Sequence, residues 1–110
     1  DVYKRQAQVA LESAKAPISI VIDCSHANSG KDPSRQPLVL DEVMKQVENG
    51  ADCIHGVMIE SHLKAGNQSF PRPLDQLDYG VSITDGCIDW STTEACLRRA
   101  AEVVDKARFS

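Results

Sequence analysis

The chain has 110 residues, of which 42% are hydrophobic and 25% charged, a composition that suits one globular domain with a modest core. Its net charge of −4 argues against a nucleic-acid-binding surface, and no apolar run reaches the roughly 20 residues of a membrane-spanning helix. The four cysteines lack CxxC spacing, which is typical of reduced core residues rather than a disulfide set: Cys24, Cys53, Cys87 and Cys96. We therefore expect a cytoplasmic enzyme or part of one.

Residues 1–6 do not resemble the start of a natural protein. They contain no initiator Met, and Asp-Val-Tyr-Lys-Arg-Gln matches the in-frame translation of a transposase end sequence used in sequencing libraries. We predict that residues 1–6 are an adapter-derived remnant and that residues 7–110 form the domain, with natural sequence missing on the N-terminal side. The alternative is that residues 1–6 are the true start of the first helix.

The first half of the chain predicts two helices and two buried strands. Apolar residues at helical spacing indicate a helix over residues 7–15. Residues 18–22 and 53–59 are short and largely apolar, which is typical of strands that are covered on both faces. Between these strands, a second helix ends at Asn49-Gly50 and has one apolar face: Leu40, Val43, Met44 and Val47.

The second half predicts a long loop, a third strand and a final helix. No regular period appears between residues 61 and 80, and a loop of this length usually serves as a lid or binding loop. A third strand is predicted at residues 81–83, and its extension to residue 88 is an alternative. Residues 91–94, Ser-Thr-Thr-Glu, have capping-box spacing and begin a helix that extends to about residue 107. The alternation of helices and strands predicts an α/β fold with parallel strands, whose two open edges indicate an incomplete sheet.

Three polar residues follow the three predicted strands: His26, Glu60 and Asp85. They lie 34 and 25 residues apart, close to the roughly 30 residues of one strand–helix unit in an eight-unit α/β barrel. Because active-site groups of such barrels follow the strands at one end, the spacing indicates one shared site. One imidazole and two carboxylates suit a divalent ion such as Mn²⁺, Fe²⁺, Co²⁺ or Zn²⁺.

Each of these residues also has a simpler interpretation. His26 is an ordinary polar loop residue in that view, and Asp85 caps a turn with the glycine that follows it. Glu60 would pair with Lys64 or Arg72 across the loop. No one of the three residues indicates a metal site alone, and a site is favoured because all three follow consecutive strands.

Other polar side chains near these positions have secondary roles in the hypothesis. Asp23, Ser25 and Asn28 are placed to orient the metal ligands. His62, two residues after Glu60, is a candidate substrate contact.

The segments around the three positions are more specific than any bare metal pattern. Residues 22–29 read Ile-Asp-Cys-Ser-His-Ala-Asn-Ser, residues 56–63 read Gly-Val-Met-Ile-Glu-Ser-His-Leu, and residues 66–68 read Gly-Asn-Gln. Residues 79–88 read Tyr-Gly-Val-Ser-Ile-Thr-Asp-Gly-Cys-Ile. In this order they resemble the class I, microbial type of 3-deoxy-7-phosphoheptulonate (DAHP) synthase, over nearly all of residues 7–110.

The resemblance implies a fold, a reaction and roles for named residues. It implies that the chain is the C-terminal portion of a TIM (β/α)8 barrel, about the last three strand–helix units. The family condenses phosphoenolpyruvate with erythrose 4-phosphate and releases phosphate, at the start of the shikimate pathway. His26, Glu60 and Asp85 would hold one divalent metal ion, His26 and Asp85 would act in catalysis and contact substrate, and His62 would be a weaker substrate contact.

The resemblance also implies parts that lie outside this chain. A Cys ligand in a Gly-Pro-Cys-Ser segment and the Arg and Lys residues that hold phosphates would come from upstream, and the parent enzyme would be a homo-oligomer. Two alternatives remain. One is the related 3-deoxy-octulosonate 8-phosphate synthase, which acts on arabinose 5-phosphate, and the other is a non-catalytic barrel remnant that acts as an interaction piece. No nucleic-acid or membrane partner is expected.

Overall fold

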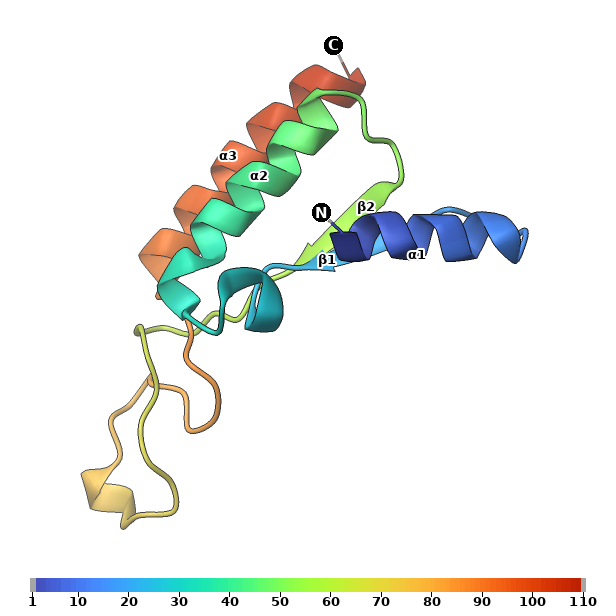
Figure 1. Ribbon diagram of the computed structural model, residues 1–110. Coiled ribbons are helices and arrows are strands. Elements are labelled where there is room, and N and C mark those ends of the chain that lie inside the picture. The colour runs from blue at the N-terminus through green and yellow to red at the C-terminus, as the bar shows by residue number, and fades with distance from the viewer. Residues whose placement is uncertain (1, 110) are drawn as a thin grey trace.

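The computed structural model describes residues 2–109 and contains two parallel strands and three α-helices (Figure 1). Helices α2 and α3 lie side by side over the strands, and α1 contacts β1. No helix within residues 2–109 is both long and apolar enough to cross a bilayer. In chain order the elements are α1 (Val2–Ser13), β1 (Ile20–Asp23), the 3₁₀ turns η1 (His26–Ser29) and η2 (Pro33–Arg35), α2 (Gln36–Glu48), β2 (Ile54–Met58), the 3₁₀ turn η3 (Leu74–Gln76) and α3 (Trp90–Phe109).

The sheet confirms the predicted parallel pairing with a helical crossover. Ile20 pairs with Ile54 and Asp23 pairs with Met58, with an irregular step after the first pair. Since α2 connects the two strands, both strands run in the same direction and their carboxyl ends meet at one edge of the sheet. The loops that follow β1 and β2 therefore begin next to each other.

The core lies between the strands and the two packed helices. The predicted apolar face of α2 is confirmed, because its four residues are all buried against β1, β2 and α3. Three of the four free cysteines are buried in the same region, and Cys87 is half-buried outside it. The cluster of buried residues is Ile20, Ile22, Cys24, Leu40, Val43, Met44, Val47, Cys53, Ile54 and Cys96.

The prediction that both strands are covered on both faces was wrong for this chain. Val21 is 65% exposed between the buried Ile20 and Ile22, and Met58 at the end of β2 is 37% exposed. The physical reason is that the helices cover one face of a two-stranded sheet, while the described residues place no layer on the other face. Successive strand residues point to opposite faces, so burial alternates along β1.

The predicted third strand was also wrong, because residues 81–88 make only isolated bridges. Ile88 bridges Ser61 in the parallel sense, beyond the end of β2. The Ile88 amide donates to the carbonyl of Glu60 at 3.1 Å, and the backbone then turns away instead of continuing the ladder. This short contact still brings the segment that carries Asp85 next to the end of β2.

Two helix boundaries differ from the sequence prediction. Helix α3 begins at Trp90, and the carboxylate of Asp89 accepts a hydrogen bond from the Thr92 amide at 2.8 Å, so Asp89 provides the cap predicted at residue 91. Helix α1 begins at Val2 rather than residue 7. A helix can continue through added residues, so the origin of residues 1–6 stays a prediction.

Candidate metal centre

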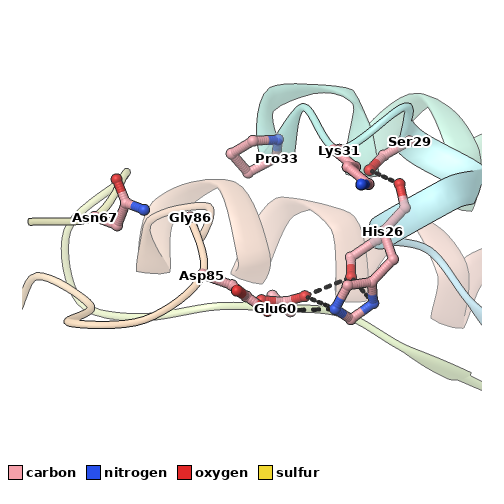
Figure 2. A pocket seen from close by; sticks show the side chains of 9 residues that line it. His26, Ser29, Lys31, Pro33, Glu60, Asn67, Asp85 and Gly86 are labelled. Atoms are coloured by element: carbon pink, nitrogen blue, oxygen red, sulfur yellow. Dashed lines mark hydrogen bonds and ion pairs between the residues drawn. The ribbon is translucent and has the colours of Figure 1, made fainter.

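The loops after β1 and β2 and the loop before α3 carry three side chains that point toward one another (Figure 2). His26 opens η1 three residues after β1, with a backbone φ of 49°, an uncommon value for a residue other than glycine. Glu60 lies two residues after β2, and Asp85 lies in the loop that the Ile88 bridge holds beside β2. The structure thus brings together the three residues that the sequence spacing grouped.

The distances among these side chains are short. Nε2 of His26 lies 2.9 Å from Oε1 of Glu60 and 3.3 Å from Oδ2 of Asp85. One ligand-type atom from each of the three residues lies within 4.8 Å of the others. Ligand atoms that surround a common ion at about 2.0–2.2 Å are separated by less than this distance, so a small closing movement would allow shared coordination.

Asp23 and Ser25 fix the orientation of the His26 ring. The Ser25 hydroxyl donates to Oε1 of Glu60 at 2.6 Å, so its oxygen is free to accept from Nδ1 of His26 at 2.8 Å. Oδ2 of Asp23 also accepts from Nδ1, at 2.9 Å. A proton on Nδ1 satisfies both acceptors and leaves Nε2 facing Glu60 and Asp85. This is the carboxylate–histidine arrangement that commonly supports a metal-bound imidazole.

The loop geometry agrees with the orienting role predicted for residues near His26. The Ser25 amide donates to Oδ1 of Asp23 at 2.8 Å, and the Asn28 side chain donates to the Asp23 carbonyl at 2.7 Å. Asp23 is therefore held from two sides while its second carboxylate oxygen contacts His26.

These contacts shift the pKa values of the two groups in opposite directions. Hydrogen bonds to Asp23 and Asp85 raise the pKa of His26 above its usual 6.5. Burial acts to raise the pKa of Asp23, but hydrogen bonds from His26 and Ser25 outweigh it, and the pKa is lowered. A proton on Nε2 is thus stabilised by the carboxylates, and its loss frees the Nε2 lone pair for a metal ion.

Glu60 is positioned by a residue that the sequence reasoning missed. The Gln36 side chain donates from Nε2 to the Glu60 carbonyl at 3.0 Å and accepts from the Glu60 amide at 2.7 Å. Gln36 is only 1% exposed. A signal was available, because residue 36 continues the apolar face of α2 four positions before Leu40, and a polar residue there needs a buried partner.

The loop that carries Asp85 is held by the preceding long loop. The Asn67 side chain donates to the Thr84 carbonyl at 3.0 Å. Next to Asp85, a Cβ added to Gly86 would lie 2.9 Å from the ring of Pro33, closer than such contacts normally come. The absence of a side chain at Gly86 therefore allows this loop to approach η2, and with it the His26 loop.

The three side chains lie in an open cavity of about 440 Å³. This size falls within the range of small-molecule sites, roughly 300–1,000 Å³. Figure 2 shows Asn67 and Lys31 around the same cavity as the three acidic and imidazole groups. The lining residues are Ser25, His26, Ser29, Lys31, Pro33, Glu60, Asn67, Asp85 and Gly86.

His62 is not among the residues that line this cavity. Its Nδ1 accepts a hydrogen bond from the Leu63 amide at 2.8 Å, and the side chain is exposed. Its role as a substrate contact stays a prediction. The alternative partners of Glu60 are not engaged with it in the described contacts, since Glu60 pairs with His26 while Arg72 donates to the Gln76 carbonyl.

The donor set fits a divalent metal ion. One imidazole nitrogen and two carboxylates converge from three loops, and the open cavity leaves room for substrate oxygens beside them. Fold and geometry together define an α/β protein with a candidate divalent-metal centre at the carboxyl edge of a parallel sheet.

Residues 4–98 match the sequence profile of the DAHP synthetase I family. The chain belongs to this family.

Named relatives agree with this assignment. A Tyr-sensitive phospho-2-dehydro-3-deoxyheptonate aldolase from Enterobacter agglomerans is 48% identical over 94 residues, which cover 84% of this chain and 44% of the relative. The Tyr-sensitive enzyme of Escherichia coli K12 is 46% identical over 93 residues, covering 84% of this chain and 26% of the relative. This chain thus spans less than half the length of these relatives.

A solved structure extends the likeness to three dimensions. A phospho-2-dehydro-3-deoxyheptonate aldolase from Francisella tularensis superimposes with a TM-score of 0.76 at 44% identity. The match covers 82% of this chain and 26% of that structure. The backbone arrangement described above is therefore shared with a solved member of the family.

Proposed function

We propose that this chain is the C-terminal part of a DAHP synthase, which condenses phosphoenolpyruvate with erythrose 4-phosphate and water to give 3-deoxy-D-arabino-heptulosonate 7-phosphate and phosphate. Membership of the family and the names of the relatives support this activity. The observation that carries the proposal is the convergence of His26, Glu60 and Asp85 on one cavity. The reaction belongs to the biosynthesis of aromatic amino acids.

The proposed architecture is a portion of a TIM barrel, about its last three strand–helix units. Two parallel strands covered by helices on one face, with the other face open, suit a section of barrel wall. The radius of gyration is 16.5 Å, against roughly 13 Å expected for a compact chain of this length. The extended shape supports the proposal that this chain is part of a barrel and packs against further strand–helix units.

In the proposed site, His26, Glu60 and Asp85 hold one divalent ion of the Mn²⁺, Fe²⁺, Co²⁺ or Zn²⁺ type. When bound, such an ion polarises the aldehyde carbonyl of erythrose 4-phosphate and makes its carbon electrophilic toward C3 of phosphoenolpyruvate.

The chain's own residues orient that chemistry. Asp23 and Ser25 hold the His26 ring with Nε2 toward the cavity. The family resemblance implies that His26 lies on the phosphoenolpyruvate side of the site. Glu60, with a side chain only 17% exposed, supplies a fixed carboxylate. Asp85, 67% exposed, remains accessible to a sugar hydroxyl.

Further parts of the proposed site belong to the longer protein. Among the described residues that line the cavity, Lys31 is the one Lys or Arg. The two substrates carry one phosphate group each, so the site needs further cations. We therefore assign a fourth metal ligand and the other phosphate-binding cations to upstream sequence. On this basis the 110-residue chain binds a divalent ion weakly and forms no product. A cytoplasmic location and a homo-oligomeric parent are part of the same proposal.

The test is an assay of the complete protein that contains this chain. We expect product from phosphoenolpyruvate with erythrose 4-phosphate and not with arabinose 5-phosphate, and loss of activity in His26→Ala. Turnover with arabinose 5-phosphate alone would indicate the related octulosonate synthase. A complete protein that folds and binds metal but turns over neither sugar would support the non-catalytic alternative.

A further inference from the structure

We propose that Gln36 is the positioning residue that sets the Glu60 carboxylate for metal binding. This inference rests on the proposed metal site. The Gln36 amide makes two hydrogen bonds to one residue, donating to the Glu60 carbonyl at 3.0 Å and accepting from the Glu60 amide at 2.7 Å. It thereby pairs with the Glu60 backbone as a neighbouring strand would. The side chain does not touch the ligand atoms, so its action passes through the Glu60 backbone.

Because Gln36 is buried, its amide group needs hydrogen-bond partners within the protein. Gln36 is 1% exposed and lies among the largest fully buried side chains of the described residues. A buried amide is costly unless its donor and acceptor are both satisfied, and the Glu60 backbone satisfies one of each. The contact therefore specifies a single position of α2 relative to the loop after β2.

The backbone of Glu60 needs such a clamp because the strand has ended. Strand β2 stops at Met58, two residues earlier, and the ladder no longer fixes the chain there. The same Glu60 carbonyl that accepts from Gln36 also accepts from the Ile88 amide at 3.1 Å. With its backbone held by Gln36 and Ile88, Glu60 directs Oε1 to the Ser25 hydroxyl and to Nε2 of His26.

The amide group of Gln36 has the required chemistry, and its nearest replacements do not. Gln36→Met keeps an unbranched buried side chain but leaves both backbone groups of Glu60 without this partner. Gln36→Glu keeps an acceptor for the Glu60 amide, yet an ionised carboxylate cannot donate to the carbonyl. Both variants should weaken the hold on the Glu60 backbone, which keeps its Ile88 contact, while leaving every proposed metal ligand in place.

The experiment uses the complete protein that contains this chain, with Val43→Ala as the matched control. Val43 is 4% exposed in the same helix but is buried in the apolar core, so its truncation destabilises the fold without removing the clamp. Two quantities are measured in each variant under folding conditions. One is the Mn²⁺ affinity by NMR titration, and the other is the hydrogen-exchange rate of the Glu60 amide relative to amides of β1.

We expect Gln36→Met and Gln36→Glu to weaken Mn²⁺ binding about 10- to 100-fold, the usual effect of removing a residue that orients a ligand. The Glu60 amide should exchange faster in Gln36→Met, while Val43→Ala keeps the original affinity. Affinity within twofold of the unsubstituted protein in the Gln36 variants would overturn the inference, as would an equal loss in Val43→Ala.

Failure of the proposed metal site gives a different result. If the unsubstituted complete protein binds no Mn²⁺, the metal site itself is contradicted, and the role of Gln36 in metal binding falls with it. The exchange rate then still decides whether the clamp exists. Faster exchange of the Glu60 amide in Gln36→Met would support the clamp, and an unchanged rate would overturn it.

Discussion

The helix-covered core and the rim of loops beyond the strands differ in almost every physical property. The core joins β1, β2, α2 and α3 through apolar side chains that are almost fully buried. The rim holds His26, Glu60 and Asp85 on loops, with polar side chains that contact one another; those of His26 and Asp85 are more than half exposed, and that of Glu60 is 17% exposed. Stability and metal chemistry therefore depend on different residues in this chain, and Gln36 is a buried connection between the two regions.

The largest effect on stability is expected from Leu40→Ala. Leu40 is 1% exposed in the middle of the core, and truncation there removes apolar contacts and leaves a cavity. We expect a loss of about 2–5 kcal/mol in the free energy of unfolding, measured by urea denaturation. The control is Leu38→Ala on the same helix, where the side chain is 64% exposed and the expected change is within about 0.5 kcal/mol. Equal losses in the two variants would contradict the assigned core.

The largest effect on metal binding is expected from Glu60→Gln at the rim. The substitution preserves shape but removes the negative charge and one ligand oxygen, so we expect Mn²⁺ affinity to fall by more than the roughly 100-fold upper range for orienting residues. Glu48→Gln makes the same charge change at the exposed end of α2 and should leave the affinity unchanged. A similar loss in both variants would indicate a general charge effect rather than a specific ligand.

The reactivity of the cysteine thiols is expected to differ between the core and the rim. Burial raises the pKa of the Cys24 thiol to about 11, with further contributions from the nearby Asp23 and Cys96, and Cys24 has no exposed surface. Cys87 beside the rim is half-buried, and burial raises its pKa as well. We expect iodoacetamide to label Cys87 first, and Cys24 only on unfolding, as followed by peptide mass spectrometry. Labelling of both at equal rates in the folded chain would contradict this prediction.

The smallest effect is expected from the cap of α3. Hydrogen bonds from Thr92 lower the pKa of Asp89 below 3.8, so its stabilising contribution is present above the unfolded-state pKa and is lost as pH falls through the lowered folded-state value. Asp89→Ala should lower the urea midpoint at pH 7, and the difference from the unsubstituted chain should shrink towards pH 2. Asp89→Asn retains a capping oxygen and should lose less. A difference independent of pH would show that the charge contributes nothing.

Much of this arrangement was predictable from local sequence patterns. The apolar stripe of α2 predicted its buried face, and the apolar runs predicted two parallel strands with a helix between them. The spacing of His26, Glu60 and Asp85 predicted that they meet, because loops at the carboxyl ends of parallel strands share one edge.

The wrong and missed predictions share one cause. A sequence pattern indicates the type of an element but not which other residues it will pair with or pack against. Residues 81–88 have strand-like composition but find only one bridge beside β2, at Ile88. The strand that contains Val21 has the apolar composition of a strand covered on both faces, yet the described residues cover only one face of the sheet. Gln36 was missed because a polar residue at the start of a helix is usually exposed, and only the fold reveals Glu60 as its partner.

The central claim is that His26, Glu60 and Asp85 form one metal site. The most direct test is paramagnetic line broadening by Mn²⁺ in NMR spectra of the isotope-labelled 110-residue chain. We expect broadening centred on the amides around these three residues, saturating at one ion per chain and absent in Glu60→Gln. No localised broadening, or broadening centred elsewhere and unchanged in Glu60→Gln, would contradict it.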